Sequence, residues 1–382
     1  MPKVILTITM LLLSAQLIGA EKDSISQILN DITITQDVYT SPLKNSDAQN
    51  ITLNMGFMHR LPKILGNADP VRYSQMLPGV QTNSEYDSGI HIYGCDNSHN
   101  LVSIDGVPVY NATHLLGLFS VFIPSHFKEM SLRMNASAEN NANRLGGTMN
   151  MSLHDTIPAK VEGEYSIGAM SSQGTLKIPI DKNKALFLSL RASYLNLLYS
   201  SLLTIDDSKL KYSFGDLNAT YLHKVNNKNT LNINIYAGKD IVKLEDDEEK
   251  IEKASITPSY NIVWGNILLS ASWNHKSDSK EIKQKIYFTG YSNKYKILDD
   301  YTIKIPSGIQ EFGYNINAKI RNLNYGLTLV HHSIKPQNPS TESSSIKSSI
   351  SVFASKTPSR SWRNSRCACP ITVKTAICGR TI

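Results

Sequence analysis

Residues 231–237 read LNINIYA, so apolar and hydrogen-bonding side chains alternate one by one along this stretch. Successive side chains of a β-strand point to opposite faces, and the stretch therefore predicts a strand with one apolar face and one wet face. The same alternation recurs in residues 186–191, 269–274 and 314–320, with Phe187 as an exception. We therefore predict an antiparallel sheet of such strands after residue 160.

The connections between these strands help to choose between a soluble β-sandwich and a membrane β-barrel. Tight connections are predicted at residues 181–184, 226–229, near Gly265 and 321–324, and long ones at 200–212, 239–253, from Lys276 and 335–345. Short turns at one rim and long loops at the other are typical of an outer-membrane barrel. We predict about ten membrane-crossing strands of about ten residues each in residues 160–355, which is too few for a barrel that holds a domain in its lumen.

The first 20 residues predict a cleaved signal peptide. Lys3 precedes a mostly apolar run over residues 4–13, and small residues stand before a polar start at Glu21. A membrane anchor is the alternative, but the run is shorter than the roughly 20 apolar residues that a helix needs to cross a bilayer.

The formal net charge of +7 is concentrated at the ends of the chain. Six Lys or Arg and no acid lie in residues 356–382, and without these and Lys3 the chain holds 32 basic and 32 acidic residues. A neutral body removes the support for nucleic-acid binding.

Residues 356–382 differ in composition from the rest of the chain. Three of the four cysteines, Cys367, Cys369 and Cys378, lie there, and their spacing predicts neither a disulfide framework nor a zinc site. We interpret this stretch as an atypical basic tail after a truncated barrel, read in a shifted frame. A divergent tail is the alternative.

Residues 51–158 predict a compact mixed domain of short strands, short helices and turns, behind a flexible lead-in over residues 21–50. Asp69-Pro70 suits a helix start, because proline is tolerated in the first turn. Ile104-Asp105-Gly106-Val107 predicts a tight turn between two strands, since Asp-Gly accepts positive φ.

Several motifs between Leu61 and Leu153, in this order, resemble the plug domain of TonB-dependent outer-membrane receptors. They are LPKILG at 61–66, LPGVQ at 77–81, SGIHIYG at 88–94, NLVSIDGVPVYN at 100–111 and RLGG at 144–147. The segment HLLGLFSVF at 114–122 is similar to one branch of the family. The resemblance implies a small α+β plug domain (residues 51–158) followed by an antiparallel transmembrane β-barrel segment (residues 160–355) with about 10 of the family's 22 strands.

The resemblance also implies the partners and the location. They are the outer membrane and its lipid, a TonB-type inner-membrane energy-coupling protein, a small extracellular ligand and, in some relatives, a surface lipoprotein. The ligand classes are iron chelates, cobalamin and oligosaccharides. The stretch Asp31, Ile32, Thr33, Ile34 and Thr35 is rich in β-formers and is expected to be extended, so it fits either the coupling box that adds a strand to the motor protein or the first plug strand.

Polar loop residues that flank one plug strand are the ligand-binding candidates. Convergent polar side chains at a loop tip suit a sugar or a metal chelate, although the same residue types also form turns. The candidates are Asn83, Glu85, Tyr86, Asp87, Asp96, Asn97, Ser98 and His99. The histidines His91, His99, His114 and His126 are too scattered to predict a metal site.

We see no motif for catalysis or for a cofactor, so the chain is interpreted as part of an uptake receptor and not as an enzyme. Two alternatives remain open. One is a secreted, soluble β-rich binding protein, and the other is a non-functional truncated remnant of a receptor.

Overall fold

The computed structural model describes residues 43–47, 50–61, 63, 65–82, 89–134, 144–199, 204–205, 208–245, 259–298, 302–320, 323–337, 346–358 and 371–378. The chain divides into residues 1–41 and residues 42–382, and every described residue lies in the second unit. The predicted signal peptide (residues 1–20) and coupling segment (Asp31–Thr35) lie outside the described residues. In the described part of the chain, no helix is long and apolar enough to cross a membrane.

The N-terminal region, which we define as the described residues between 43 and 153, contains a six-stranded sheet of order β1-β2-β9-β10-β5-β6. β10 and β5 pair in parallel, and the other neighbours are antiparallel. The strands are β1 (Leu43–Asp47), β2 (Asn50–Asn54), β5 (Leu101–Ile104), β6 (Val107–Pro108), β9 (Glu129–Arg133) and β10 (Thr148–Ser152).

Short helices and two small strand pairs complete this region. β3 (Val80–Gln81) pairs with β4 (His91–Ile92), and β7 (Thr113–His114) pairs with β8 (Phe119–Ser120). The helices are η2 (Met55–Arg60), α2 (Pro70–Ser74), η3 (Asn97–His99), η4 (Leu115–Gly117) and η5 (Pro124–His126). The core lies on the central strands, where Leu53, Ile104, Met130, Leu132 and Met151 are almost completely buried.

Two local predictions in this region are confirmed. The Asp69 carboxylate caps α2 by accepting hydrogen bonds from the backbone amides of Val71 (2.9 Å) and Arg72 (3.1 Å). The turn between β5 and β6 has φ of 46° at Asp105 and 78° at Gly106, as a tight hairpin turn requires.

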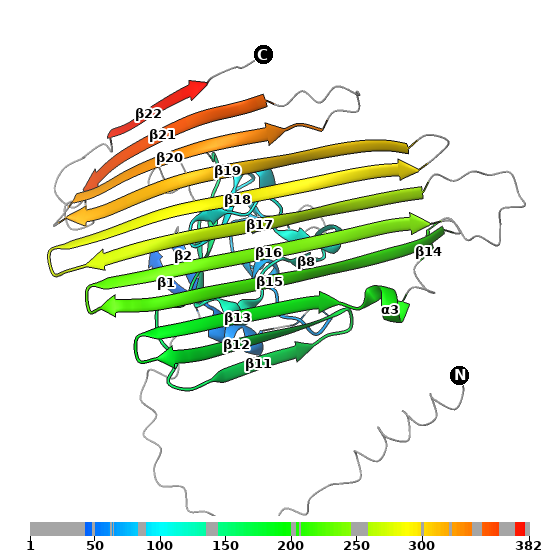
Figure 1. The fold of residues 1–382 in the computed structure, drawn as a ribbon, viewed down its shortest axis with the longest axis horizontal. Coiled ribbons are helices and arrows are strands. Elements are labelled where there is room, and N and C mark those ends of the chain that lie inside the picture. The colour runs from blue at the N-terminus through cyan, green and yellow to red at the C-terminus, as the bar shows by residue number, and fades with distance from the viewer. Residues whose placement is uncertain are drawn as a thin grey trace, which may run out of the picture. The chain divides into compact units, whose positions relative to one another are not determined.

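The long sheet contains twelve strands among the described residues, and each main strand pairs antiparallel with the next, as Figure 1 shows. The two-residue β14 lies off this path and pairs with β15, and α3 (Leu195–Tyr199) follows β13. The strands are β11 (Glu162–Ile167), β12 (Ser171–Asp181), β13 (Lys184–Ser193), β14 (Thr204–Ile205), β15 (Ser208–Asn226), β16 (Asn229–Glu245), β17 (Ser259–Lys276), β18 (Lys280–Leu298), β19 (Thr302–Ile320), β20 (Leu323–Lys335), β21 (Ile346–Pro358) and β22 (Ile371–Cys378).

The two faces of the long sheet differ in chemistry, as the alternation predicts. On β13, Ser189 and Arg191 are buried against the N-terminal region and Phe187 is buried beneath His154, whereas Leu190 is 62 % exposed on the other face. We call the exposed apolar side the outer belt: Leu190, Leu217, Ile235, Ile267, Leu269, Ile286 and Phe312. The belt is continuous across strands, because Ile235 pairs with Leu269, Leu269 with Phe288, and Phe288 with Phe312.

Several predicted features of the strands are wrong. Gly265 lies inside β17 and not in a turn: a Cβ there would stand 2.5 Å from the carbonyl oxygen of Gly238, so glycine serves close strand approach. The long loop expected from Lys276 is a short turn, in which the Ser277 amide donates to Lys280 O at 2.8 Å. β15 and β18 are 19 residues long rather than about ten.

The strand pattern also extends beyond residue 355, where the predicted barrel segment ends. β21 continues to Pro358, and residues 371–378 pair with it as β22. The stretch ITVKTAIC at 371–378 keeps the branched apolar residues that favour a strand, although its basic and cysteine-containing surroundings obscure the pattern.

Two tyrosines of the inner face lie flat over glycines. A Cβ on Gly238 would collide with the Tyr236 hydroxyl, and a Cβ on Gly313 would collide with the Tyr287 ring across the strand pair. Both hydroxyls donate to carboxylates, Tyr236 to Asp216 (3.1 Å) and Tyr287 to Glu311 (2.6 Å). The two glycines therefore leave room for the tyrosine rings, whose hydroxyls hold the carboxylates of Asp216 and Glu311. These carboxylates also bind residues of the N-terminal region.

Substitution of Gly313 tests this arrangement. We expect Gly313→Ala to displace the Tyr287 ring and to lower the free energy of unfolding by about 1–3 kcal/mol, the usual cost of overpacking. The measurement is the denaturant midpoint of the folded chain. Gly174→Ala is the control, since its added Cβ would meet its nearest atom, Glu164 O, at 3.8 Å. Equal midpoints for the two variants would contradict the role of Gly313.

Candidate functional site

The N-terminal region contacts the inner face of the long sheet through a series of polar pairs along β17 and β18. The Lys285 ammonium lies 2.5 Å from Asp105 Oδ2, and Thr289 Oγ1 donates to Pro108 O at 2.8 Å. Asn266 Nδ2 donates to Asn111 O at 2.5 Å, from a position that pairs with Tyr291 of β18. Residues 105–111 therefore run along the inner face of the sheet and bond in turn to Lys285, Thr289 and Asn266.

The chain then returns along β12 and β13. Arg191 Nη2 donates to Ser120 O at 2.7 Å, and the Ser125 and Thr175 hydroxyls are 2.6 Å apart. His126 contacts the Ser189 hydroxyl at 2.8 Å through Nδ1. Residues 111–120, between the two series of contacts, therefore form a bend at the end of the wall nearest the predicted long loops.

The His114 cluster at this bend is the densest group of charges in the interface. His114 Nδ1 lies 2.8 Å from Asp240 Oδ2, and Nε2 lies 2.9 Å from both oxygens of Asp216. Arg191 Nη2 binds Asp216 at 2.6 Å. The Tyr212 hydroxyl donates to Asp240 and accepts from the Leu115 amide. All four charged side chains are at least 95 % buried.

The charge of this cluster follows from its composition. Two carboxylates face one guanidinium, so a protonated His114 makes the cluster electrically neutral. Burial alone would lower the pKa of His114, but the Asp216 and Asp240 carboxylates outweigh burial and raise it. The imidazole also stacks on the Phe214 ring, with centroids 4.7 Å apart. His114 thus acts as a charged link between the N-terminal region and two strands of the sheet.

Two further carboxylates join the same two parts of the chain. Asp105 binds Lys285 and, at 3.0 Å, Lys283; burial would raise the pKa of Asp105, but the two ammonium groups lower it to about 2. Glu311 of β19 accepts from the Tyr110 hydroxyl and lies 2.8 Å from His332 Nε2.

His126 makes a neutral contact instead. Burial lowers the pKa of His126 to about 3, so the ring is uncharged at neutral pH and bonds to the hydroxyls of Ser189 and Thr220. Among the described residues, no group of three or more His, Cys, Asp or Glu could hold a metal ion. Both His114 and His126 are buried and bond across the interface, His114 to carboxylates and His126 to hydroxyls.

Only half of the predicted ligand-binding residues can be placed. Asn83, Glu85, Tyr86 and Asp87 lie outside the described residues, whereas Asp96, Asn97, Ser98 and His99 are exposed on and before η3. The Asp96 carboxylate accepts from the Ser98 amide (2.9 Å), and Asn97 Oδ1 accepts from the Ile90 amide (3.1 Å). These two side chains stabilise the turn, and Ser98 and His99 remain on its surface.

The strand residues that contact the N-terminal region were not identified from the sequence. Arg191, Asp216, Asp240, Lys285 and Glu311 are charged residues at wet-face positions inside the long strands. A charge in the middle of an alternating strand was the available signal, since a buried charge requires a partner. The partner itself, such as His114 at 102 residues from Asp216, is not given by any local pattern.

Removal of the His114 charge tests the link. Because the folded-state pKa of His114 is raised, its contribution to stability is complete below the unfolded-state value of about 6.5 and is lost as pH rises through the folded-state value. We expect the unfolding midpoint of the chain to fall as pH is raised above 6.5, and His114→Gln to lack this fall. His331→Gln, at an exposed position on β20, is the control. A pH dependence that persists in His114→Gln would contradict the assignment.

Neither the comparison with protein-family models nor the one with curated proteins finds a match. Solved structures do match. A variant of the ferric enterobactin receptor from Pseudomonas aeruginosa superposes with a TM-score of 0.58 at 13 % identity, covering 82 % of this chain and 55 % of that chain.

Two other similar structures are the siderophore receptor PirA from Acinetobacter baumannii and the outer membrane transporter YddB from Escherichia coli. PirA gives a TM-score of 0.56 at 13 % identity, covering 81 % of this chain and 54 % of that one. YddB gives 0.55 at 10 % identity, with the same two shares of 81 % and 54 %.

The chain thus spans about 55 % of the length of the receptors that it matches, and at these identities the likeness concerns the fold. The mostly antiparallel long sheet agrees with part of a receptor barrel. The resemblance in residues 61–153 and the structural match concur: this chain has the fold of the TonB-dependent outer-membrane receptors.

Proposed function

We propose that the chain forms the plug and the first part of the barrel of an energy-coupled outer-membrane receptor that takes up a small extracellular ligand. The outer belt carries the proposal. A row of exposed Leu, Ile and Phe on neighbouring strands is far more apolar than a surface in contact with water normally is. Lipid is the solvent that such a face requires.

The length of the strands supports this assignment. A strand of 18 residues, such as β17, extends about 60 Å, and a tilt of about 45° leaves roughly 40 Å along the membrane normal. This exceeds the hydrocarbon thickness of about 30 Å, so the strand ends would project into water on at least one side.

The inner face supports the assignment of residues 51–158 as the plug. Its buried positions carry Ser, Thr, Asn, Arg, Asp and Lys, and several of these bind the N-terminal region. A polar lumen that is filled by a separate folded region is the arrangement that a plugged barrel requires.

The ligand and the energy-coupling partner follow from the same proposal. Two of the similar structures are described as a ferric enterobactin receptor and a siderophore receptor, and we extend to this chain only a small extracellular ligand, whether an iron chelate, cobalamin or an oligosaccharide. Asn83, Glu85, Tyr86, Asp87, Ser98 and His99 remain our candidates for contact with it. We propose Asp31–Thr35 as the segment that the TonB-type protein captures by strand addition.

Detergent dependence and cell fractionation test the proposal. The chain, expressed with its own N-terminus, is expected in the outer-membrane fraction and is expected to need detergent to remain monodisperse. A chain that stays monomeric in detergent-free buffer would instead be the soluble β-rich binding protein. A chain found only in aggregates or degraded would be the non-functional remnant.

A charge in the outer belt gives a sharper test. We expect Leu269→Arg to destabilise the membrane-inserted chain by about 2–4 kcal/mol, because arginine near the bilayer midplane must be solvated in hydrocarbon. The measurement is the denaturant midpoint in lipid vesicles. Asn183→Arg, in the exposed turn between β12 and β13, is the matched control and should leave the midpoint unchanged. Leu269→Arg without effect in vesicles would exclude a lipid-facing belt.

A further inference from the structure

Lysines are concentrated at one end of the outer face of the long sheet. Because side chains alternate, the outer face of β17 continues from Leu269 and Ile267 to Gly265, Val263 and Asn261. Each of the last three lies in a row of paired residues that crosses β15 to β19, which are neighbours in Figure 1. These three rows contain no Asp or Glu. Their lysines, which we call the lysine group, are Lys211, Lys239, Lys243, Lys294, Lys296 and Lys304.

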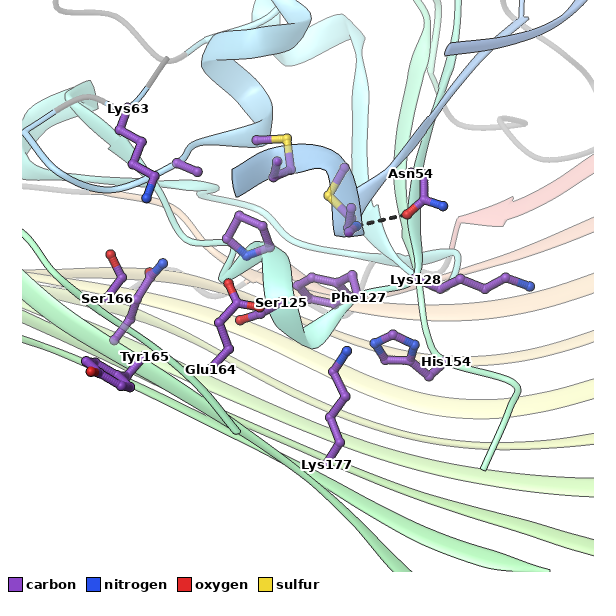
Figure 2. Close-up of a pocket in the computed structure, with 16 residues that line it drawn as sticks. Asn54, Lys63, Ser125, Phe127, Lys128, His154, Glu164, Tyr165, Ser166 and Lys177 are labelled. Atoms are coloured by element: carbon purple, nitrogen blue, oxygen red, sulfur yellow. Dashed lines mark hydrogen bonds between the residues drawn. The ribbon is translucent and has the colours of Figure 1, made fainter. Parts of the chain in front are cut away.

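No comparable group lies elsewhere on the described part of these strands. Toward the short turns, the outer face of β15 to β19 carries a single lysine, Lys280. Lysines of the inner face are directed at the N-terminal region instead. Lys285 binds Asp105, and in Figure 2 Lys177 of β12 extends toward Ser125 and His154. The lysine group is therefore a local feature of one end of the outer face.

The distance from the outer belt gives the depth of the lysine group in a membrane. The row of Leu269 is the centre of the belt, and the row of Asn261 lies eight positions further along β17. This is about 26 Å along the strand, or about 19 Å along the membrane normal at a tilt of about 45°. Lipid headgroups lie between about 15 and 22 Å from the midplane. Lys296 and Lys304, in the row of Asn261, are therefore at headgroup depth.

The connections identify the leaflet. β16 and β17 are joined at this end through residues 246–258, whereas short turns such as the one between Lys276 and Lys280 lie at the other end. In outer-membrane barrels the short turns face the periplasm and the longer loops are extracellular. The lysine group therefore faces the outer leaflet.

Three members of the lysine group are close enough to bind one anion. Lys296 pairs directly with Lys304, so their Cβ atoms are about 5 Å apart, and Lys294 lies about 7 Å further along the same strand. No ion pair joins these three to another residue that the structure describes. Lys211 and Lys243 take part in other contacts. Three flexible side chains can thus bring their ammonium groups together.

We propose that the lysine group binds the phosphorylated headgroup of an outer-leaflet lipid. The phosphate lies among Lys294, Lys296 and Lys304, and the acyl chains of the same lipid lie along the outer belt. Ammonium groups form charge-assisted hydrogen bonds with phosphate oxygens. Lys239, one row nearer the belt than Lys294, reaches the headgroup by extending its side chain toward the interface. This inference rests on the proposed membrane insertion and concerns a site separate from the loops for the transported ligand.

Native mass spectrometry of the full chain in detergent, with lipid A that carries two phosphates as the probe, tests the site. Phosphatidylcholine has acyl chains without net charge, and inorganic phosphate has the charge without the chains. Each is expected to bind at least about tenfold more weakly than lipid A. Equal affinity for phosphatidylcholine would overturn the role of the phosphate. Equal affinity for inorganic phosphate would show a site for a soluble anion instead of a lipid.

Variants identify the lysines that bind. The combined change Lys294→Gln, Lys296→Gln and Lys304→Gln is expected to weaken lipid A binding at least about tenfold. The matched control removes the same charge from exposed positions at the other end of the strands, through Lys182→Gln, Lys228→Gln and Lys280→Gln. The control is expected to keep the affinity of the unmodified chain. Equal affinity of the two combined variants, whether weakened or not, would overturn the assignment.

The outcome is separable from that of the proposed function. A chain that binds lipid A in detergent but is absent from the outer-membrane fraction overturns the proposed function alone. A chain in the outer membrane whose two combined variants bind lipid A equally overturns the lysine group alone. If the first combined variant does not fold, Lys294→Gln with Lys304→Gln, both at exposed positions, is titrated in its place.

Discussion

The central strands of the long sheet carry a polar inner face and an apolar outer face, and this division constrains the rest of the structure. A shift of one residue in register would bring Ile235 or Leu269 to the inner face and Asn234 or Ser270 to the outer one. The register is therefore set by burial on one side and by the outer belt on the other. Glycine is placed where strands or tyrosine rings approach too closely for a side chain, as at Gly238 and Gly313.

The inner face resolves a second physical problem, which is the burial of charge. Removing an ion from water costs several kcal/mol unless partners replace the solvent. At the bend of the N-terminal region, His114 supplies the second positive charge that Asp216 and Asp240 require beside Arg191. The same rule holds at Asp105, where Lys283 and Lys285 replace water. Buried charge is thus distributed in balanced groups that each join two segments distant in the sequence.

Local chemistry made part of this fold predictable. The alternation at 231–237 correctly predicted a strand and its two faces. The Asp69 cap and the Asp105-Gly106 turn were also predictable, because each joins residues no more than three positions apart along the chain. Gly265 was misjudged because glycine has the same sequence signature in a turn and at a close strand contact. The strand lengths were underestimated because charged residues such as Lys239 and Lys276 are typical of loops. Both in fact pair with the neighbouring strand and continue the sheet.

The interface illustrates what the sequence could not provide. The polar side chains that fill it are hydroxyls, amides and balanced ions, each chosen for a partner more than fifty residues away in most cases. Such surfaces differ from an apolar core once they are parted. Water can replace each hydrogen bond that is lost, so a polar face that is exposed by separation would be hydrated and would not attract apolar surfaces. Sliding of the N-terminal region along the sheet would therefore exchange many of these hydrogen bonds for others, and the apolar surface that it would have to expose is concentrated where Phe119 packs on Phe214 and Trp264.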